Sequence, residues 1–394
     1  MDIITLEWII RSRTGTRDEM TMFDLNEYVE RLRRVRGAMA AQGLDALVVD
    51  EIESMAWLSG YGVSETLWRC CCVPKDADPF LVVRELDMAP AAEKSWISDI
   101  SGFLDWHDPV VLTAGRLAAL GSVHRVGVDF GSPAMTAARL GALRAALGAG
   151  IEVCDTGRLI STLRLIKSDK EIACLARASS IADIALGEAI AAVRPGGTER
   201  DILQAAATAF MENGADDTQV GPITSGKGWG FLHGFVHDTC LEDGDIAHIE
   251  LIPKYRGYSA RIMRSVVVGE ATAEQQATAS SLVALQDRQI AAMWPGACAR
   301  DVDAIMREGV LEAGLRTDYT NITGYTLGLY CLPSQRTSDF TRIFHPDAEW
   351  LLEEDMVFHM YTSARGLAFS ETVLVTAKGP KRLTAFPRRL YQTA

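Results

Sequence analysis

The 394-residue sequence predicts an α/β (α+β) protein built from two domains. The length exceeds that of an average domain. In the first 160 residues, short apolar strands alternate with segments of helical periodicity, which favours a mainly parallel or mixed sheet covered by helices. In the remainder, pairs of long helices alternate with β-rich blocks. We therefore expect an N-terminal domain over residues 1–160 and a C-terminal domain over residues 161–394.

The N-terminal domain begins with a helix. Apolar residues recur at helical spacing over residues 25–40, and Gly43 is a helix stop. The same criteria predict strands at residues 44–50, 80–85, 97–103 and 125–130. They predict helices at residues 89–95, 110–120 and 135–147, so that strands and helices alternate along most of the domain. We expect this domain to end between residues 155 and 163.

The C-terminal half begins with two well-capped helices. Ser168 is a good N-cap, and Glu171 follows three residues later as in a capping box. Pro195 ends this helix, and Thr198 caps the next one in the same way. Two more long helices are predicted at residues 273–294 and 299–313, and β-rich blocks at residues 222–268 and 321–376.

Composition and charge limit the class of partner. With 48% hydrophobic and 23% charged residues the chain can bury sizeable cores, which excludes a disordered protein. The net charge of −13 repels nucleic acid and anionic membranes, and the basic residues are scattered. No run of 18 apolar residues is present, and the N-terminus does not resemble a secretory signal. We expect a cytoplasmic protein that acts on a small molecule, with neither nucleic acid nor a membrane as partner.

The cysteines predict no metal or redox site. Three of the eight are consecutive, Cys70, Cys71 and Cys72, and successive residues of a strand point to opposite faces of a sheet. No C-x-x-C pair occurs, so neither a zinc site nor a redox motif is indicated. We expect buried thiols in a reducing compartment.

Five stretches in the C-terminal half carry a resemblance to a known family: LRLIKSDKEI, HGFVHDTCLEDGDIAHIEL, RGYSARIMRSVVVG, GYTLGLYCLP and MVFHMYTSARGLAFSETVLVT. In this order they resemble the creatinase, prolidase and methionine aminopeptidase (pita-bread) family, most closely its metal-free creatinase and ectoine hydrolase-like members. The match runs from Leu163 to the end, and a weaker one covers the N-terminal domain. The resemblance implies a creatinase-like α/β N-terminal domain, a C-terminal pita-bread domain and a homodimer.

The resemblance also implies where metal ligands would lie. In metal-dependent members of the family, two Asp, one His and two Glu bind two metal ions. The corresponding positions, called the family metal positions below, hold Glu250, Arg261, Tyr325, Tyr361 and Ser370. Of these, only Glu250 is a good ligand, because a guanidinium has no lone pair to offer. We therefore expect no metal and no other cofactor.

The activity implied is metal-independent hydrolysis of a C–N bond in a small amide, amidine or cyclic amidine, not classical metallo-aminopeptidase activity. His233 falls on the histidine that creatinase uses for proton transfer, and an imidazole can take a proton from water and give one to a leaving nitrogen. Glu250 and Glu371 are expected to orient a water or to bind a cationic amidine. Arg261 is expected to supply positive charge to an oxyanion or carboxylate.

Further residues are predicted to contact the substrate. Tyr325 and Tyr361 would donate hydrogen bonds, and His359 would join them if it faces the same side of its strand as Tyr361. Candidates for a contact with a substrate carboxylate are Trp68, Arg69 and Arg336. By contrast, we expect Arg264 to be structural and His248 to be a surface or core residue.

Structural alternatives remain open for these residues. Arg261 and Glu250 could form a buried ion pair that fills a vacated cavity, and His233 could be a structural turn residue. The whole chain could be a catalytically inactive pita-bread binding module, or a single-metal enzyme using Glu250, Glu371 and a histidine. The side chains at the family metal positions are polar rather than apolar, which favours a metal-independent enzyme. Filling an unused cavity with apolar side chains would cost less free energy than burying polar ones.

Overall fold

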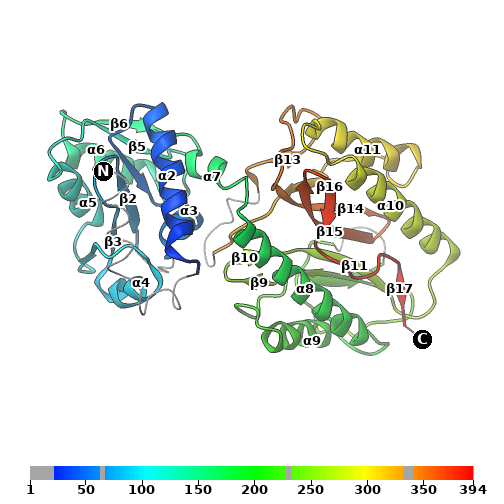
Figure 1. The fold of residues 1–394 in the computed structure, drawn as a ribbon. Coiled ribbons are helices and arrows are strands. Elements are labelled where there is room, and N and C mark those ends of the chain that lie inside the picture. The colour runs from blue at the N-terminus through cyan, green and yellow to red at the C-terminus, as the bar shows by residue number, and fades with distance from the viewer. Residues whose placement is uncertain (1–21, 63–66, 228–231, 332–339, 394) are drawn as a thin grey trace. The chain divides into compact units, whose positions relative to one another are not determined.

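The computed structural model describes residues 22–62, 67–227, 232–331 and 340–393. The chain divides into two compact units. Of the described residues, those up to Arg164 and Cys331 form the N-terminal unit, and those from Leu165 to Tyr330 and from Phe340 onward form the C-terminal unit. Figure 1 shows the helices and strands of both units, coloured from blue at the N-terminus to red at the C-terminus. None of the described helices is long and apolar enough to span a membrane.

A six-stranded mixed sheet forms the centre of the N-terminal unit, in the order β4-β3-β2-β1-β5-β6. Its strands are β1 (Ala46–Val49), β2 (Cys70–Pro74), β3 (Phe80–Arg84), β4 (Ile100–Phe103), β5 (Arg125–Val128) and β6 (Glu152–Asp155). β2 pairs antiparallel with β1 and β3, whereas the other pairs are parallel. A mixed sheet agrees with the alternation of strands and helices in the sequence, which predicts four of these strands, β1, β3, β4 and β5, but not β2 or β6.

The helices of this unit are α2 (Leu25–Ala41), α3 (Ile52–Ser59), α4 (Met88–Lys94), α5 (Pro109–Ala118), α6 (Ala137–Leu147) and α7 (Leu159–Leu163), with a short 3₁₀ turn at Glu85–Asp87. The sequence patterns predict four of them, α2, α4, α5 and α6, to within two residues at each end. Residues from α5, α6 and the sheet share one apolar core, to which Cys70 and Cys72 belong. The expectation of buried thiols is correct for Cys70, Cys71 and Cys72 but wrong for Cys240, which is exposed.

A larger sheet organises the C-terminal unit, in the order β13-β12-β14-β15-β11-β8-β7. The strands are β7 (Ile223–Gly226), β8 (Ile246–Leu251), β11 (Ile262–Val267), β12 (Gly324–Thr326), β13 (Ile343–Phe344), β14 (Val357–Ala364) and β15 (Leu367–Thr376). β16 (Gly379–Arg382) pairs with β15, and β17 (Tyr391–Gln392) pairs with β11. β9 (Lys254–Tyr255) and β10 (Tyr258–Ser259) form a separate hairpin.

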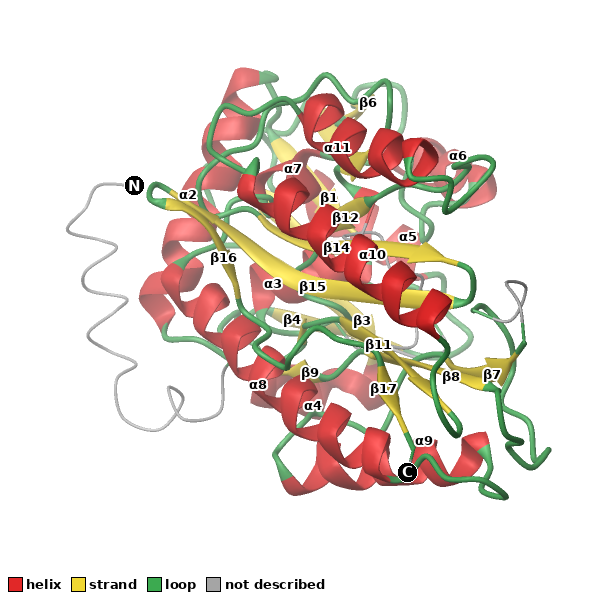
Figure 2. Cartoon of the chain, turned by 90° about the vertical axis from the view of Figure 1, so that its right-hand side faces the viewer, coloured by secondary structure: helices red, strands yellow, loops and turns green. Residues whose placement is uncertain are grey.

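Two helix pairs pack on one face of this sheet: α8 (Asp169–Ala191) with α9 (Glu199–Glu212), and α10 (Ala273–Ala291) with α11 (Ala299–Glu312). Figure 2 shows α10 lying across β14 and β15. The apolar side chains of this face, such as Ile249, Ile262 and Phe358, belong to the cores under these helices. Ser168 and Glu171 form the capping box of α8 that the sequence predicts.

Candidate functional site

The register of the C-terminal sheet brings four side chains into one row. Glu250 on β8 lies opposite Met263 on β11, Met263 lies opposite Ser370 on β15, and Ser370 lies opposite Tyr361 on β14. Residues directly opposite one another in a sheet point to the same face. This face, called the site face below, is the one turned away from the helix-packed residues. Three of the family metal positions therefore lie side by side on four adjacent strands.

Arg261 directly precedes β11, and its side chain contacts a member of this row, Glu250. Its Nη1 atom donates to the Tyr325 hydroxyl at 2.7 Å and lies 3.4 Å from a carboxylate oxygen of Glu250. The backbone of Arg261 is fixed to β15, because its N–H donates to the Thr372 hydroxyl and its carbonyl accepts from the same hydroxyl, each at 2.9 Å. Glu250 and Arg261 are each only 3% exposed. A guanidinium thus connects a carboxylate and a phenol at three of the family metal positions.

His359 completes an aromatic cluster on the site face. Its ring lies edge-on to Tyr325, with ring centroids 5.0 Å apart, and stacks on Tyr361 at 5.3 Å. Burial lowers the pKa of His359 well below its ordinary value, and the positive charge of Arg261 lowers it further. The imidazole is therefore neutral. The prediction that His359 shares a face with Tyr361 is confirmed by this stacking.

Several buried polar atoms of the site face have no hydrogen-bond partner among the described residues. They are both ring nitrogens of His359, Oγ of Ser370, Nδ1 of His248 and Oγ1 of Thr224. His248 and Thr224 lie opposite each other on β8 and β7. Buried polar groups in folded proteins are almost always paired with protein or water. These atoms therefore indicate where water or a ligand binds.

His233 lies in the exposed segment that leads to β8. The pKa of His248 is lowered to about 3, mainly by burial and further by the charge of His233. His233 therefore lies within electrostatic range of His248. Sequence reasoning missed His248, although it lies two residues before Glu250 on the same strand and so points to the same face.

Glu371 does not join the cluster. It follows Ser370 on β15 and therefore points to the helix-packed face. There it forms an ion pair with Arg264 at 2.7 Å and accepts a hydrogen bond from Thr384, and it is fully buried. The structure thus does not support the prediction that Glu371 orients a water together with Glu250. The expectation that Arg264 is structural agrees with this arrangement.

Two of the three remaining predicted contacts, Trp68 and Arg69, lie in the N-terminal unit. Trp68 donates its indole N–H to Asp50 at 2.9 Å, and Arg69 donates to the carbonyl of Gly62. Both side chains are buried and have partners inside their own unit. Arg336 lies outside the described residues.

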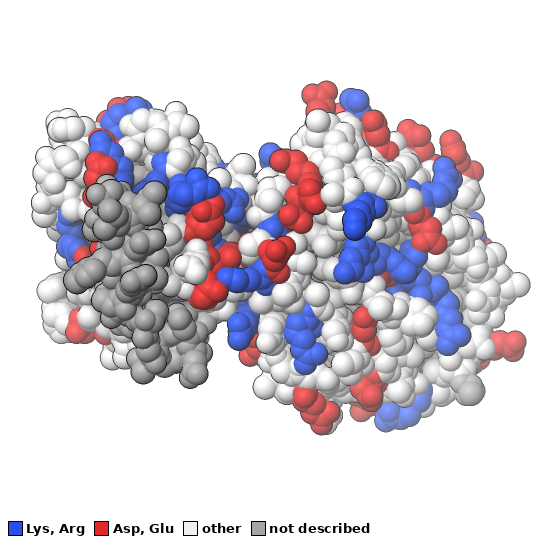
Figure 3. All heavy atoms as spheres, viewed as in Figure 1, with Lys and Arg blue, Asp and Glu red and all other residues white. Residues whose placement is uncertain are grey.

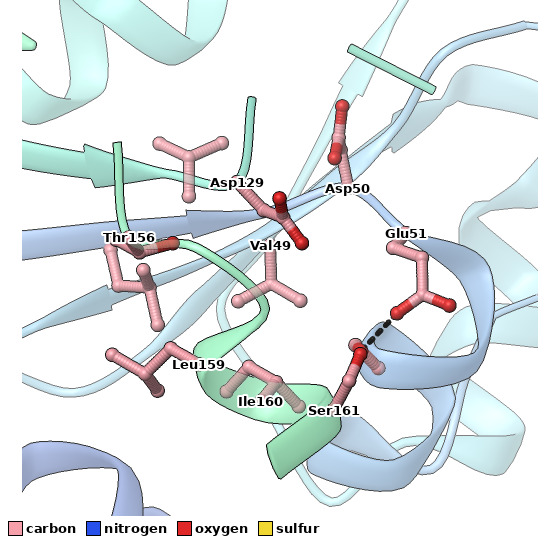
Figure 4. A pocket seen from close by; sticks show the side chains of 11 residues that line it. Val49, Asp50, Glu51, Asp129, Thr156, Leu159, Ile160 and Ser161 are labelled. Atoms are coloured by element: carbon pink, nitrogen blue, oxygen red, sulfur yellow. Dashed lines mark hydrogen bonds between the residues drawn. The ribbon is translucent and has the colours of Figure 1, made fainter. Parts of the chain in front are cut away.

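A small pocket lies at the carboxyl ends of β1, β5 and β6 (Figure 4). Its polar lining includes Asp50, Glu51 and Asp129. Asp50 accepts from Trp68, and Glu51 accepts from Ser54. These two carboxylates already serve the structure of the N-terminal unit, so we place the candidate site on the C-terminal sheet.

Comparison with known families identifies two domains in the chain. The model of metallopeptidase family M24 matches residues 173–377, and that of the creatinase/prolidase N-terminal domain matches residues 31–166. The chain belongs to family M24. It is thus a member of a hydrolase family, with a creatinase-like domain before its pita-bread domain.

Individual relatives within family M24 differ in activity. The Xaa-Pro dipeptidase of Pyrococcus furiosus is 31% identical over 238 residues, which cover 59% of this chain and 66% of that protein. The ectoine hydrolase of Halomonas elongata is 24% identical over 394 residues, covering 94% of this chain and 98% of the relative. The prolidase structure from Pyrococcus horikoshii superimposes with a TM-score of 0.76 at 24% identity, covering 91% of this chain and 99% of that one. This last likeness shows the fold alone.

The family name implies a metal, and the side chains at the family metal positions do not fit one. Glu250 is paired with a guanidinium, and Tyr325, Tyr361 and Ser370 are neutral hydroxyl groups. Within the described ranges, no group of three or more His, Cys, Asp or Glu residues is placed to hold a metal ion. One carboxylate facing a permanent cation cannot neutralise two dications.

Proposed function

We propose that this chain is a metal-independent hydrolase that cleaves a C–N bond in a small amide, amidine or cyclic amidine. The observation that carries the proposal is the position of Arg261, whose Nη1 atom lies 2.7 Å from the Tyr325 hydroxyl and 3.4 Å from Glu250. A guanidinium stays charged at any physiological pH. It can therefore supply the positive charge that metal ions supply in metal-dependent hydrolases. The full-length likeness to an ectoine hydrolase supports the same reaction type.

Each side chain has a defined part in this proposal. Arg261 and Tyr325 donate hydrogen bonds to the oxygen or nitrogen on which negative charge develops. Glu250 orients the attacking water, and His233 takes a proton from it. The water oxygen bonds to the substrate carbon, the C–N bond breaks, and the proton passes to the leaving nitrogen. Tyr361 donates a hydrogen bond from the neighbouring strand.

The test is turnover with and without chelator. Purified protein is screened against small amides, lactams, cyclic amidines including ectoine, creatine, and Xaa-Pro dipeptides. We expect hydrolysis of a non-peptide substrate at a rate that EDTA does not change. Arg261→Gln should lower kcat/KM by about 10²–10³, the usual cost of one lost transition-state donor. Arg365→Gln, which removes an exposed arginine, is the matched control.

Two outcomes would contradict the proposal. Hydrolysis of Xaa-Pro dipeptides that EDTA abolishes would assign the chain to the metal-dependent peptidases, which its relative from Pyrococcus furiosus favours. Ligand binding without any turnover would favour the inactive binding module. The replacement of ligands by Arg261, Tyr325, Tyr361 and Ser370 is the observation that keeps this second function open.

A further inference from the structure

His359 and Ser370 are neighbours on the site face and share an uncommon property. His359 lies opposite Thr372, two positions along β15 from Ser370, so the two side chains are diagonal neighbours. Both residues are 0% exposed. No residue in the described ranges forms a hydrogen bond with either ring nitrogen of His359 or with Oγ of Ser370.

Leaving these atoms without partners is costly for the fold. Burial removes water from each donor and acceptor, and an apolar side chain of similar shape would avoid that cost. The two residues lie on β14 and β15, central strands of the sheet. Polar groups at such positions are best explained by a ligand that completes their hydrogen bonds.

The chemistry of the two residues limits that ligand. A neutral imidazole has one donor and one acceptor, and a serine hydroxyl can act as either. A carboxylate offers acceptors only, and an amidinium offers donors only. An amide offers both a carbonyl acceptor and an N–H donor. Together with water it can therefore form hydrogen bonds with both ring nitrogens of His359 and with the hydroxyl group of Ser370. Glu250 and Arg261 form an ion pair with each other, so neither side chain offers an unpaired charge to a second ion.

We propose that His359 and Ser370 bind the uncharged amide group, C(=O)–NH, of the substrate. This inference rests on the proposed function, because it names the substrate class of the same site. It narrows the amide, amidine and cyclic amidine candidates to the amides, including lactams. His359 and Ser370 then determine specificity, and Arg261 and Glu250 lie beside the bond that breaks.

Three probes of nearly identical shape test the inference. Acetamide, acetamidinium and acetate differ in hydrogen-bonding capacity and charge, and their binding to the full chain can be followed by ligand-observed NMR. We expect acetamide to bind at least tenfold more tightly than either ion. His359→Leu and Ser370→Ala should each weaken acetamide binding at least tenfold. His359→Gln, which keeps a donor and an acceptor, should restore part of it.

Thermal unfolding of the same variants separates a binding role from a structural one. If a ligand completes these groups, His359→Leu and Ser370→Ala should leave Tm unchanged or raise it. A preference for acetate or acetamidinium, no binding of acetamide by the wild-type chain, or unchanged acetamide binding in both variants would each overturn the inference. Binding of acetamide as predicted without turnover of any amide would instead contradict only the proposed function.

Discussion

Arg261 and Arg264 are three residues apart, and each pairs with a glutamate, yet their surroundings differ. Arg264 donates to Glu371 and to the carbonyl groups of Met263, Ser370, Phe386 and Pro387. The planar guanidinium thus binds several strands and the C-terminal segment together on the helix-packed face. Arg261 instead donates to a phenol and a carboxylate on the site face. At the residue scale, Arg264 holds the fold together on the helix-packed face, whereas Arg261 joins a phenol and a carboxylate on the site face.

The first prediction concerns the buried pair of Arg264 and Glu371. Glu371→Gln should lower the free energy of unfolding by about 3–5 kcal/mol, because it leaves the buried guanidinium without its counter-ion. Urea unfolding measures the change. Arg382→Gln is the control. Arg382 is partly exposed and lies 4.0 Å from the same carboxylate, so its ion pair with Glu371 is weaker than that of Arg264. A stable Glu371→Gln protein without activity would show instead that Glu371 takes part in catalysis.

Sequence reasoning could identify most of the site residues but not their mutual geometry. Glu250, Arg261, Tyr325, Tyr361 and Ser370 follow from the motifs. Glu371 directly follows Ser370 in the chain, and adjacent residues of a strand face opposite sides, so the prediction that Glu371 acts together with Glu250 is not supported. The direction of the Arg261 side chain could not be derived, because it depends on Thr372 from a strand more than a hundred residues away.

At the element scale, the first turn of α9 connects β7 with the segment that carries His233. Glu199 is the first residue of α9 and is almost fully buried. One of its carboxylate oxygens accepts from the Ser225 hydroxyl on β7 at 2.7 Å, and the other accepts from the backbone N–H of His237 at 2.6 Å. This carboxylate is therefore the anchor of an otherwise exposed segment.

The second prediction follows from that anchor. Glu199→Ala should increase amide hydrogen exchange over residues 232–241, because it removes the side-chain acceptor that fixes the backbone at His237. It should also lower turnover if His233 transfers the proton. Glu212→Ala, at the exposed end of the same helix, is the matched control. Exchange that stays unchanged in the Glu199 variant would show that other contacts hold the segment.

Helices with strong end signals were predictable, and short buried elements were not. The capping residues Ser168, Thr198 and Thr272 begin α8, α9 and α10 in the structure. The sequence patterns missed α3, because all eight of its residues are buried and it has no polar stripe to reveal a helical period. They also missed β6, β16 and β17, strands of two to four residues whose pairing depends on distant parts of the chain.

At the scale of the whole molecule, acidic and basic side chains are both present on the face of each unit that Figure 3 shows. A short group of Lys and Arg side chains lies near the middle of the C-terminal unit in this view. Inside that unit, His248 and His359 are buried and neutral. The free energy of unfolding should therefore fall in acid because of these two imidazoles, which lie in the sheet that carries the candidate site.

The third prediction is a loss of stability in mild acid. The unfolded chain protonates each imidazole near the ordinary pKa of 6.5, whereas folding lowers the pKa of His248 to about 3 and that of His359 well below 6.5. Below pH 6.5 the unfolded state binds more protons, so each histidine removes about 1.4 kcal/mol of unfolding free energy per pH unit. This loss continues for His248 until the pH approaches about 3.

Urea unfolding at pH 7.5 and 5.5 measures this effect. His248→Leu and His359→Leu should each reduce the loss between the two pH values by about 1.4 kcal/mol. His124→Gln, which removes an exposed histidine, should leave it unchanged. A loss that is the same in wild type and in both leucine variants would mean that other groups cause the acid sensitivity.

The most direct test of the central claim is the metal content of the purified chain. Protein prepared without chelator, and again after incubation with Mn²⁺, Co²⁺ or Zn²⁺ and removal of free metal, is measured by elemental analysis. We predict far less than one metal ion per chain in every case, because Arg261 already occupies the space beside Glu250 with a positive charge. One or two bound ions per chain that disappear in a Glu250→Ala variant would contradict the account.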